Sequence, residues 1–204
     1  LVIVFWGAFE QAGGLMNIYA KEKTNRMLMG WEIPASWFQS LNAMFIIFLG
    51  TSVAAYWAKK KLKGKVATSL YKMIIGLIIM GTGFFFMSAA SSQFESQGSS
   101  AMYWLVLAYL FHTVGELCIS PVALSYITKL APLKYGSLMM GIYFAMTGFG
   151  NKLAGLLGES AEGLGEFTVF TGIALFCVLF GTLVMVFRKK LEILTHGAED
   201  DEHE

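Results

Sequence analysis

Charged residues are scarce in this chain of 204 residues, since Asp, Glu, Lys and Arg together make up 14% of it and hydrophobic residues 56%. Soluble domains typically carry about 25% charged residues. The low share therefore indicates a lipid-embedded protein. The net charge of +1 also lacks the large basic excess with which proteins bind nucleic-acid phosphates. Nucleic acid is therefore not expected as a partner.

Cysteine is scarce as well, and Cys118 and Cys177 each lie inside an apolar run. Neither has a second cysteine or a histidine at metal-ligand spacing, so we interpret both as small buried hydrophobic residues and predict neither a disulfide nor a metal site. The sequence also shows no nucleophile beside a base and no phosphate-binding loop. We therefore expect no enzymatic activity, no metal and no cofactor.

Long apolar runs dominate instead. A bilayer core about 30 Å thick requires roughly 20 apolar residues in a helix. Six segments meet that requirement, at about 1–20, 34–58, 70–91, 101–130, 134–157 and 167–187. The pattern predicts an all-α membrane protein, in which residues 1–190 form one bundle of six transmembrane helices. Residues 191–204 are expected to form an acidic cytoplasmic tail without assigned structure.

The basic residues fall mainly on one side of these expected spans. KKKLKGK (59–65) follows the second span, Lys129 and Lys134 flank the turn between the fourth and fifth, and RKK (188–190) follows the sixth. If the six helices alternate in direction, all three places face the same side of the membrane. The positive-inside rule therefore predicts a multi-pass protein of the inner (plasma) membrane with its C-terminus in the cytoplasm.

Two carboxylates are expected near the centre of the membrane. Glu10 lies about halfway along the first span, and Glu116 about halfway along the fourth. Ionisable residues at that depth are costly, so each is a functional hypothesis by default. Because desolvation favours the neutral acid and a nearby cation favours the carboxylate, either residue could carry a proton or bind a substrate amine. A protonated carboxyl that only bonds a neighbouring helix is the alternative for both.

Two further polar residues are candidates for the same site. His112 precedes Glu116 by one turn, at i and i+4, so both share a helix face. This spacing fits a proton relay with Glu116. It also fits a packed histidine that bonds backbone or hydroxyl groups, which is the favoured interpretation. Asn42, in the second span, must find its partners inside the protein because lipid offers none. It either binds a substrate amine or joins two helices.

The fourth and fifth expected spans contain residues suited to gating. Pro121 frees a backbone carbonyl shortly after Glu116, which allows either a static kink or a functional bend. The fifth span is rich in small residues, among them Gly148, and small residues let helices approach or slide. Tyr143 and Phe144 of the same span could line a pocket for substrate side chains, although core packing is an equally good interpretation of either.

Four segments, in order, resemble the proton-dependent oligopeptide transporter family of the major facilitator superfamily. They are FWGAFEQAGG (5–14), WFQSLNAMFI (37–46), HTVGELCISPVALSYITKLAP (112–132) and SLMMGIYFAMTGFGN (137–151), similar to the family's helices seven, eight, ten and eleven. The match at 112–132 is the most specific. The resemblance implies the C-terminal half, helices seven to twelve, of a bacterial-type peptide transporter, with the six-helix C-terminal bundle of the major facilitator fold.

The resemblance also implies roles for single residues. The acid matching Glu116 faces the central cavity and, with the asparagine matching Asn42, binds the peptide's N-terminal amine. Aromatic positions matching Tyr143 and Phe144 line a side-chain pocket. The acid matching Glu10 lies in or near the cavity, with a role that varies between relatives.

His112 stands where many relatives have a non-ionisable residue, which favours the packed histidine. The family's first-helix ExxER motif does not occur in this sequence. We therefore expect an N-terminal six-helix bundle of the same transporter as partner. A di- or tripeptide would bind between the two halves and be imported with protons by alternating access. The alternatives are a same-family carrier of an amino acid or nitrate, although Glu116 disfavours an anion, and a stand-alone membrane channel or scaffold.

Overall fold

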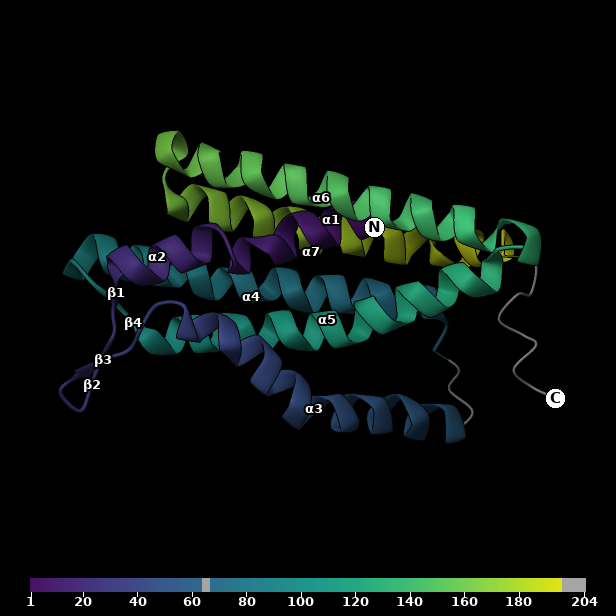
Figure 1. Cartoon of the computed structure of the whole chain (residues 1–204), viewed down its shortest axis with the longest axis horizontal. Coiled ribbons are helices and arrows are strands. Elements are labelled where there is room, and N and C mark those ends of the chain that lie inside the picture. Colours follow the sequence, from purple (N-terminus) through teal and green to yellow (C-terminus); the bar gives the residue numbers. More distant parts are fainter. Residues whose placement is uncertain (64–66, 196–204) are drawn as a thin grey trace.

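The computed structural model describes residues 1–63 and 67–195, so the acidic tail expected at 191–204 lies mostly outside the described residues. Helices dominate the chain, as expected of an all-α membrane protein (Figure 1). Within these described residues, six α-helices and two 3-10 helices follow an opening helix α1 (Val2–Phe9). They are η1 (Glu10–Ala12), α2 (Leu15–Lys23), α3 (Trp37–Leu62), α4 (Ser69–Gln97), α5 (Met102–Leu130), η2 (Leu133–Tyr135), α6 (Gly136–Leu164) and α7 (Glu166–Ile193).

Four of these helices, α3, α4, α5 and α7, are long and apolar enough to cross a bilayer. The other two expected spans, at 1–20 and 134–157, are not among these four helices. Helix α6 has 29 residues but is not among the four apolar ones, and the first expected span is interrupted. The division into six spans therefore stays a prediction.

The first expected span is not one continuous helix, which corrects the expectation for residues 1–20. Helix α1 ends at Phe9, a 3-10 turn covers Glu10–Ala12, and α2 begins at Leu15. Two consecutive glycines, Gly13 and Gly14, separate the pieces, and both of their N–H groups bond the Glu10 carbonyl at 3.2 Å. Glycine is a weak helix former, so the chain tightens and restarts here. Glu10 thus lies at a break rather than midway along a helix.

Two connections are shorter than the expected spans imply, because α4 continues past residue 91 to Gln97 and α6 past residue 157 to Leu164. Helix α4 ends at Gln97 and is capped by Gly98, whose φ is 74°. Gly165, with φ 80°, is the single residue between α6 and α7. Glycine is favoured where the backbone takes a positive φ after a helix. The turns from α4 to α5 and from α6 to α7 are therefore tight.

Helix α4 lies at the centre of the packing, against α5 on one side and α7 on the other, while α3 packs on α5 and α1 on α6. Glycines let α4 and α5 cross closely. A Cβ placed on Gly115 would lie 2.7 Å from the carbonyl oxygen of Gly76, and one on Gly76 would lie 2.7 Å from that of Gly115. Fully buried apolar side chains such as Leu77 and Phe84 fill the surrounding core.

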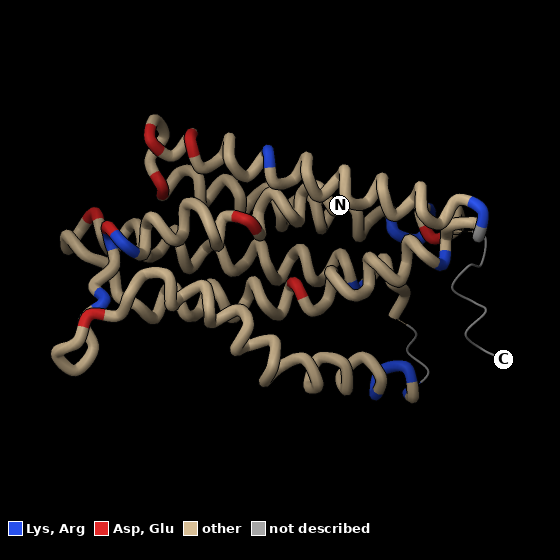
Figure 2. The backbone as a smooth tube through the Cα atoms, viewed as in Figure 1, with Lys and Arg blue, Asp and Glu red and all other residues tan. Residues whose placement is uncertain are grey.

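The charges divide between the two ends of the bundle. Figure 2 shows Lys and Arg gathered mainly where α3, α5 and α7 end, and Asp and Glu mainly at the opposite end. Acidic residues also lie about midway along α5 and at the break between α1 and α2. The lysine-rich end of α3, the α5–α6 turn and the end of α7 thus share one side, as the alternation of helices predicts.

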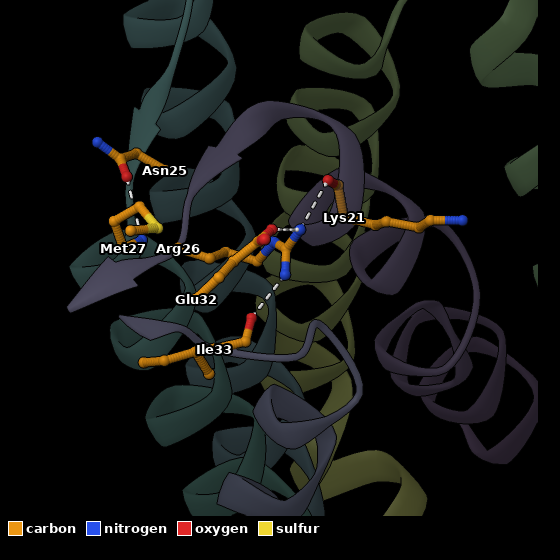
Figure 3. A network of polar contacts seen from close by, with 6 residues as sticks. All are labelled: Lys21, Asn25, Arg26, Met27, Glu32 and Ile33. Carbon is orange, nitrogen blue, oxygen red and sulfur yellow. Dashed lines mark hydrogen bonds and ion pairs between the residues drawn. The ribbon is translucent and has the colours of Figure 1, made fainter. Parts of the chain in front are cut away.

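Short strands close the more acidic end. β1 (Thr24–Asn25) pairs in parallel with β4 (Ser100–Ala101), and β2 (Met27–Leu28) forms a hairpin with β3 (Trp31–Glu32). Arg26 fixes the base of this hairpin, as Figure 3 shows. Its Nη1 donates to the Ile33 carbonyl at 2.6 Å and its Nη2 pairs with Glu32 Oε1 at 2.5 Å. An ion pair of 2.5 Å between Lys23 and Glu166 joins α2 to α7 at this end.

Candidate functional site

Helix α5 positions Glu116 through its close crossing with α4. Gly115 lies against α4, and the next residue points about 100° away around the helix, toward α3. Asn42 of α3 meets it there. The Asn42 Nδ2 donates to Glu116 Oε2 at 2.8 Å. Both side chains are half-buried. The structure thus brings together the two residues expected at the amine-binding site, and their role in binding stays a prediction.

Thr113 orients the amide of Asn42. The Asn42 Nδ2 also donates to Thr113 Oγ1 at 3.2 Å, and Thr113 Oγ1 in turn donates to the Tyr109 carbonyl at 2.7 Å. Because the single hydroxyl hydrogen of Thr113 is donated to Tyr109, Thr113 Oγ1 can only accept from Asn42, so the amide nitrogen faces Thr113 and Glu116. Both amide hydrogens are therefore used, and within residues 1–63 and 67–195 the Asn42 Oδ1 and Glu116 Oε1 have no hydrogen-bond partner.

The break between α1 and α2 is tied to two other helices. The Tyr109 hydroxyl donates to the Ala12 carbonyl at 2.9 Å, which fastens the break to α5. The buried Gln11 amide donates to the Ala154 carbonyl at 2.9 Å, which fastens it to α6. The Ala12 carbonyl and the Gln11 side-chain amide thus both have partners inside the protein, as a membrane interior requires.

Glu10 lines a cavity of about 530 Å³ between this break, α2 and α6. The α6 side supplies Asn151, Glu159 and Glu162, all exposed. Glu10 itself is half-buried, and Glu116 is not among the lining residues. The two expected mid-membrane carboxylates therefore have different surroundings. Separately, no metal-ligating cluster of three His, Cys, Asp or Glu occurs in the described part of the chain.

His112 is packed, with 1% of its surface exposed and its ring 4.4 Å from that of Phe84. Neither ring nitrogen has a hydrogen-bond partner among the described residues, so the expected bond to backbone or hydroxyl is not formed. A Cβ on Gly83 of α4 would lie 2.8 Å from the ring. His112 is thus enclosed against α4, and no hydrogen bond to Glu116 supports the relay.

Tyr143 and Phe144 lie in opposite environments. Tyr143 is buried at 6% exposure and belongs to the apolar core, whereas Phe144 is 61% exposed. Their rings meet edge to face, with centroids 5.5 Å apart. Neither contacts Glu116 or Asn42 through a hydrogen bond or ring contact in the described chain. A pocket that both would line stays a prediction.

The gating candidates are also placed. Pro121 lies inside α5, which continues past it to Leu130, and in Figure 1 the second half of α5 runs toward α6. Gly148 has no atom within 4 Å of the position of a Cβ. Gly150 makes the close contact instead, because its Cβ would lie 2.7 Å from Trp6 Cβ. A gating role for Pro121 or Gly148 stays a prediction.

Sequence reasoning missed three residues of this network. Thr113 and Tyr109 precede Glu116 on one side of α5 at helical spacings of three and seven, which could have indicated them. Gln11 adjoins Glu10, but its partner in α6 depends on a break that the apolar pattern conceals.

Comparisons with known proteins place this geometry in context. Residues 1–163 match the profile of the POT family, PTR2. The chain is 42% identical over 159 residues to the peptide transporter YePEPT of Yersinia enterocolitica, covering 76% of this chain and 30% of that protein. It is 26% identical to a di-/tripeptide transporter of Lactococcus lactis subsp. cremoris, covering 93% and 38%.

Solved structures agree with these relatives. The crystal structure of a peptide transporter POT in complex with sulfate is similar, with a TM-score of 0.85 and 28% identity, over 93% of this chain and 38% of that one. A POT family transporter in complex with a thioalcohol-conjugated peptide has a TM-score of 0.82 at 25% identity. The chain therefore spans little more than a third of the length of these proteins, and the likeness confirms the expected all-α membrane fold.

Proposed function

Because this chain belongs to the POT family, we propose that it is the C-terminal half of a proton-coupled symporter that imports di- and tripeptides by alternating access. Its relatives include a peptide transporter and di-/tripeptide transporters. The chain covers 30% and 38% of two of them, which leaves room for an N-terminal six-helix bundle as partner. Transporter sites of this kind lie at the interface of two repeats.

The pairing of Asn42 with Glu116 carries the proposal. Glu116 Oε1 and Asn42 Oδ1 are two acceptors without a partner in the described chain, on side chains that the 2.8 Å bond between Nδ2 and Oε2 joins. A peptide's ammonium group has three donors and a positive charge. It would neutralise the carboxylate and bond both acceptors, and hydrogen bonds between ionised groups are about twice as strong as neutral ones.

Protons are the proposed coupling ions, and Glu116 and Glu10 are the proposed carriers. A proton on Glu116 would remove the charge that holds the amine, so the same carboxyl responds to both substrate and proton. Tyr109 connects this carboxyl's helix to the Glu10 break through the Ala12 carbonyl. Movement of α5 would therefore pull on the break. The family is one of transporters, and we propose neither a catalytic activity nor a metal or organic cofactor.

The charge distribution supports an orientation. The lysine-rich end of the bundle is proposed to face the cytoplasm, by the positive-inside rule. The protein would lie in the inner (plasma) membrane, with its C-terminus on the same cytoplasmic side. The exposed apolar side chains of α6, among them Leu138, Phe144 and Phe149, are proposed to meet the N-terminal bundle or lipid.

Glu116→Gln in the full-length transporter tests the proposal. We expect proton-driven uptake of a labelled dipeptide into proteoliposomes to fall at least about tenfold, because a neutral amide lacks the charge for the ammonium group. Glu95→Gln, at an exposed residue of α4, is the matched control and should retain uptake. Wild-type uptake by Glu116→Gln would remove this carboxyl from the mechanism.

Competition distinguishes the alternative substrates. A free dipeptide should compete with the label, whereas the same dipeptide with an acetylated amine should not. Stronger competition by nitrate or a single amino acid would favour another solute. Ion currents without added peptide would instead favour a channel.

A further inference from the structure

A separate cavity of about 450 Å³ lies between α3, α4 and α5. Its α5 wall consists of Val114 and Cys118, which stand two residues before and two residues after Glu116. Two helical positions amount to a rotation of 200°, so both point about 160° away from Glu116. The cavity therefore lies on the face of α5 opposite to the proposed peptide site. It is also lined by Tyr56, which is 59% exposed on α3, a helix long and apolar enough to cross a bilayer, so the bilayer would lie on this side.

The end of this cavity near the last turn of α3 is lined by Lys60, Trp57 and Tyr71. Lys60 Nζ lies over the rings of Tyr71 and Trp57, at 4.8 and 5.2 Å from their centroids. Lys72 Nζ lies 5.9 Å from the Trp57 ring. Neither lysine has a carboxylate partner in the described part of the chain. Their charges are thus met only by aromatic faces.

A carboxylate of the neighbouring helix α7 is already paired with a basic residue. Glu192 of α7 pairs with Arg188 at 3.2 Å and accepts a hydrogen bond from Thr68. Arg188 in turn lies 5.0 Å from the centroid of Tyr71. The mouth of the cavity therefore carries an excess of positive charge that no described acid balances.

The inner part of the cavity is apolar. Ile75 and Ile79 of α4 continue inward from Tyr71, and the eight residues from Tyr71 to Ile79 correspond to a helical rise of about 12 Å. The buried Trp57 Nε1 has no hydrogen-bond partner among the described residues. The cavity thus has a positively charged mouth at Lys60, an unpaired N–H donor on Trp57 and an apolar wall of Ile75 and Ile79 farther in.

We propose that this cavity binds an anionic phospholipid, with the phosphate between Lys60 and Lys72 and an acyl chain along Ile75 and Ile79. Basic pockets between membrane helices bind acidic lipid headgroups in this way. The apolar interior and the lipid-facing side favour a lipid over soluble phosphate. The Trp57 N–H would donate to a phosphate or ester oxygen.

The full-length transporter, purified in detergent, provides the test. Native mass spectrometry would measure binding of phosphatidylglycerol and, for comparison, phosphatidylcholine. Each basic residue near a membrane surface strengthens binding of an anionic lipid by roughly fivefold, so Lys60→Ala and Lys72→Ala should each weaken phosphatidylglycerol binding about fivefold. Lys134→Ala removes a lysine at the same end of the bundle, outside the cavity, and should leave binding unchanged.

Tryptophan fluorescence locates the lipid. Phosphatidylglycerol with dibrominated acyl chains should quench the wild-type protein more than Trp57→Phe, because Trp57 lines the cavity that the bound lipid would occupy. Equal phosphatidylglycerol binding by the Lys60, Lys72 and Lys134 variants would overturn the proposal. So would equal quenching in the presence and absence of Trp57. Displacement of the lipid by millimolar inorganic phosphate would show a site for soluble phosphate and would likewise overturn the lipid assignment.

Discussion

The amide of Asn42 donates a 2.8 Å hydrogen bond to the carboxyl of Glu116, so α3 and α5 meet at a half-buried carboxylate. The Asn42 Nδ2 donates its second hydrogen bond to Thr113 Oγ1, at 3.2 Å. The arrangement leaves one oxygen of each residue for a further donor. The proposed mechanism depends on this pair, in which the Glu116 carboxyl is positioned by the Asn42 amide and is not a lone acid in lipid.

Replacing Asn42 should weaken substrate binding. Asn42→Ala removes one acceptor for the peptide amine and the bond to Glu116. Hydrogen bonds to charged groups contribute about 1.5–3 kcal/mol, so we expect the apparent affinity for a dipeptide to fall at least about tenfold in the full-length transporter. Isothermal titration with dipeptide measures this change, and Asn25→Ala, at an exposed residue of the β1 segment, serves as control. An unchanged affinity would leave Asn42 as a structural residue.

Tyr109 is expected to connect the break to α5. Tyr109→Phe removes the hydroxyl that donates to the Ala12 carbonyl while keeping the buried ring. The loss of one neutral hydrogen bond costs about 1 kcal/mol, so the melting temperature should decrease by a few degrees at most. If α5 moves the break during transport, uptake should decrease more than binding. Binding and uptake that decrease together would argue against this coupling.

Two glycines of α6 provide a matched pair for the gating hypothesis. Gly150→Ala places a Cβ 2.7 Å from Trp6 Cβ, and such overpacking costs about 1–3 kcal/mol. Gly148→Ala meets no atom within 4 Å and should not destabilise the bundle. A gating role for Gly148 therefore predicts slower uptake at an unchanged melting temperature. Normal uptake by Gly148→Ala would refute that role.

His112 is expected to matter for packing rather than for proton movement. His112→Ala leaves a cavity beside Phe84 and Gly83, and substitutions of this kind cost at least about 2 kcal/mol. The melting temperature should fall while proton-driven uptake per folded molecule is retained. A loss of uptake as severe as that of Glu116→Gln, at equal amounts of folded protein, would restore the relay hypothesis.

Local patterns explain which parts of the fold were predictable. The apolar runs predicted α3, α4, α5 and α7 because helix formation in lipid depends on residues close in sequence. Their ends were less predictable, since the turns at Gly98 and Gly165 depend on single positive φ angles. The break at Gly13 and Gly14 was missed because apolar residues continue on both sides of it, so the 20-residue segment as a whole has the length and hydropathy of a span.

The sequence by itself determined that this chain lies in a membrane, that it carries a carboxylate midway along a helix, and that it resembles peptide transporters. These conclusions rest on hydropathy, on the cost of a buried charge and on motifs within single helices. Only the tertiary structure decided that Asn42, 74 positions away, bonds Glu116, and that Tyr109 reaches Ala12 across 97 positions. It also decided that Tyr143 is buried while Phe144 is exposed. The reason is physical: contacts between helices depend on their crossing angle and rotation, which distant glycines such as Gly76 and Gly115 set together.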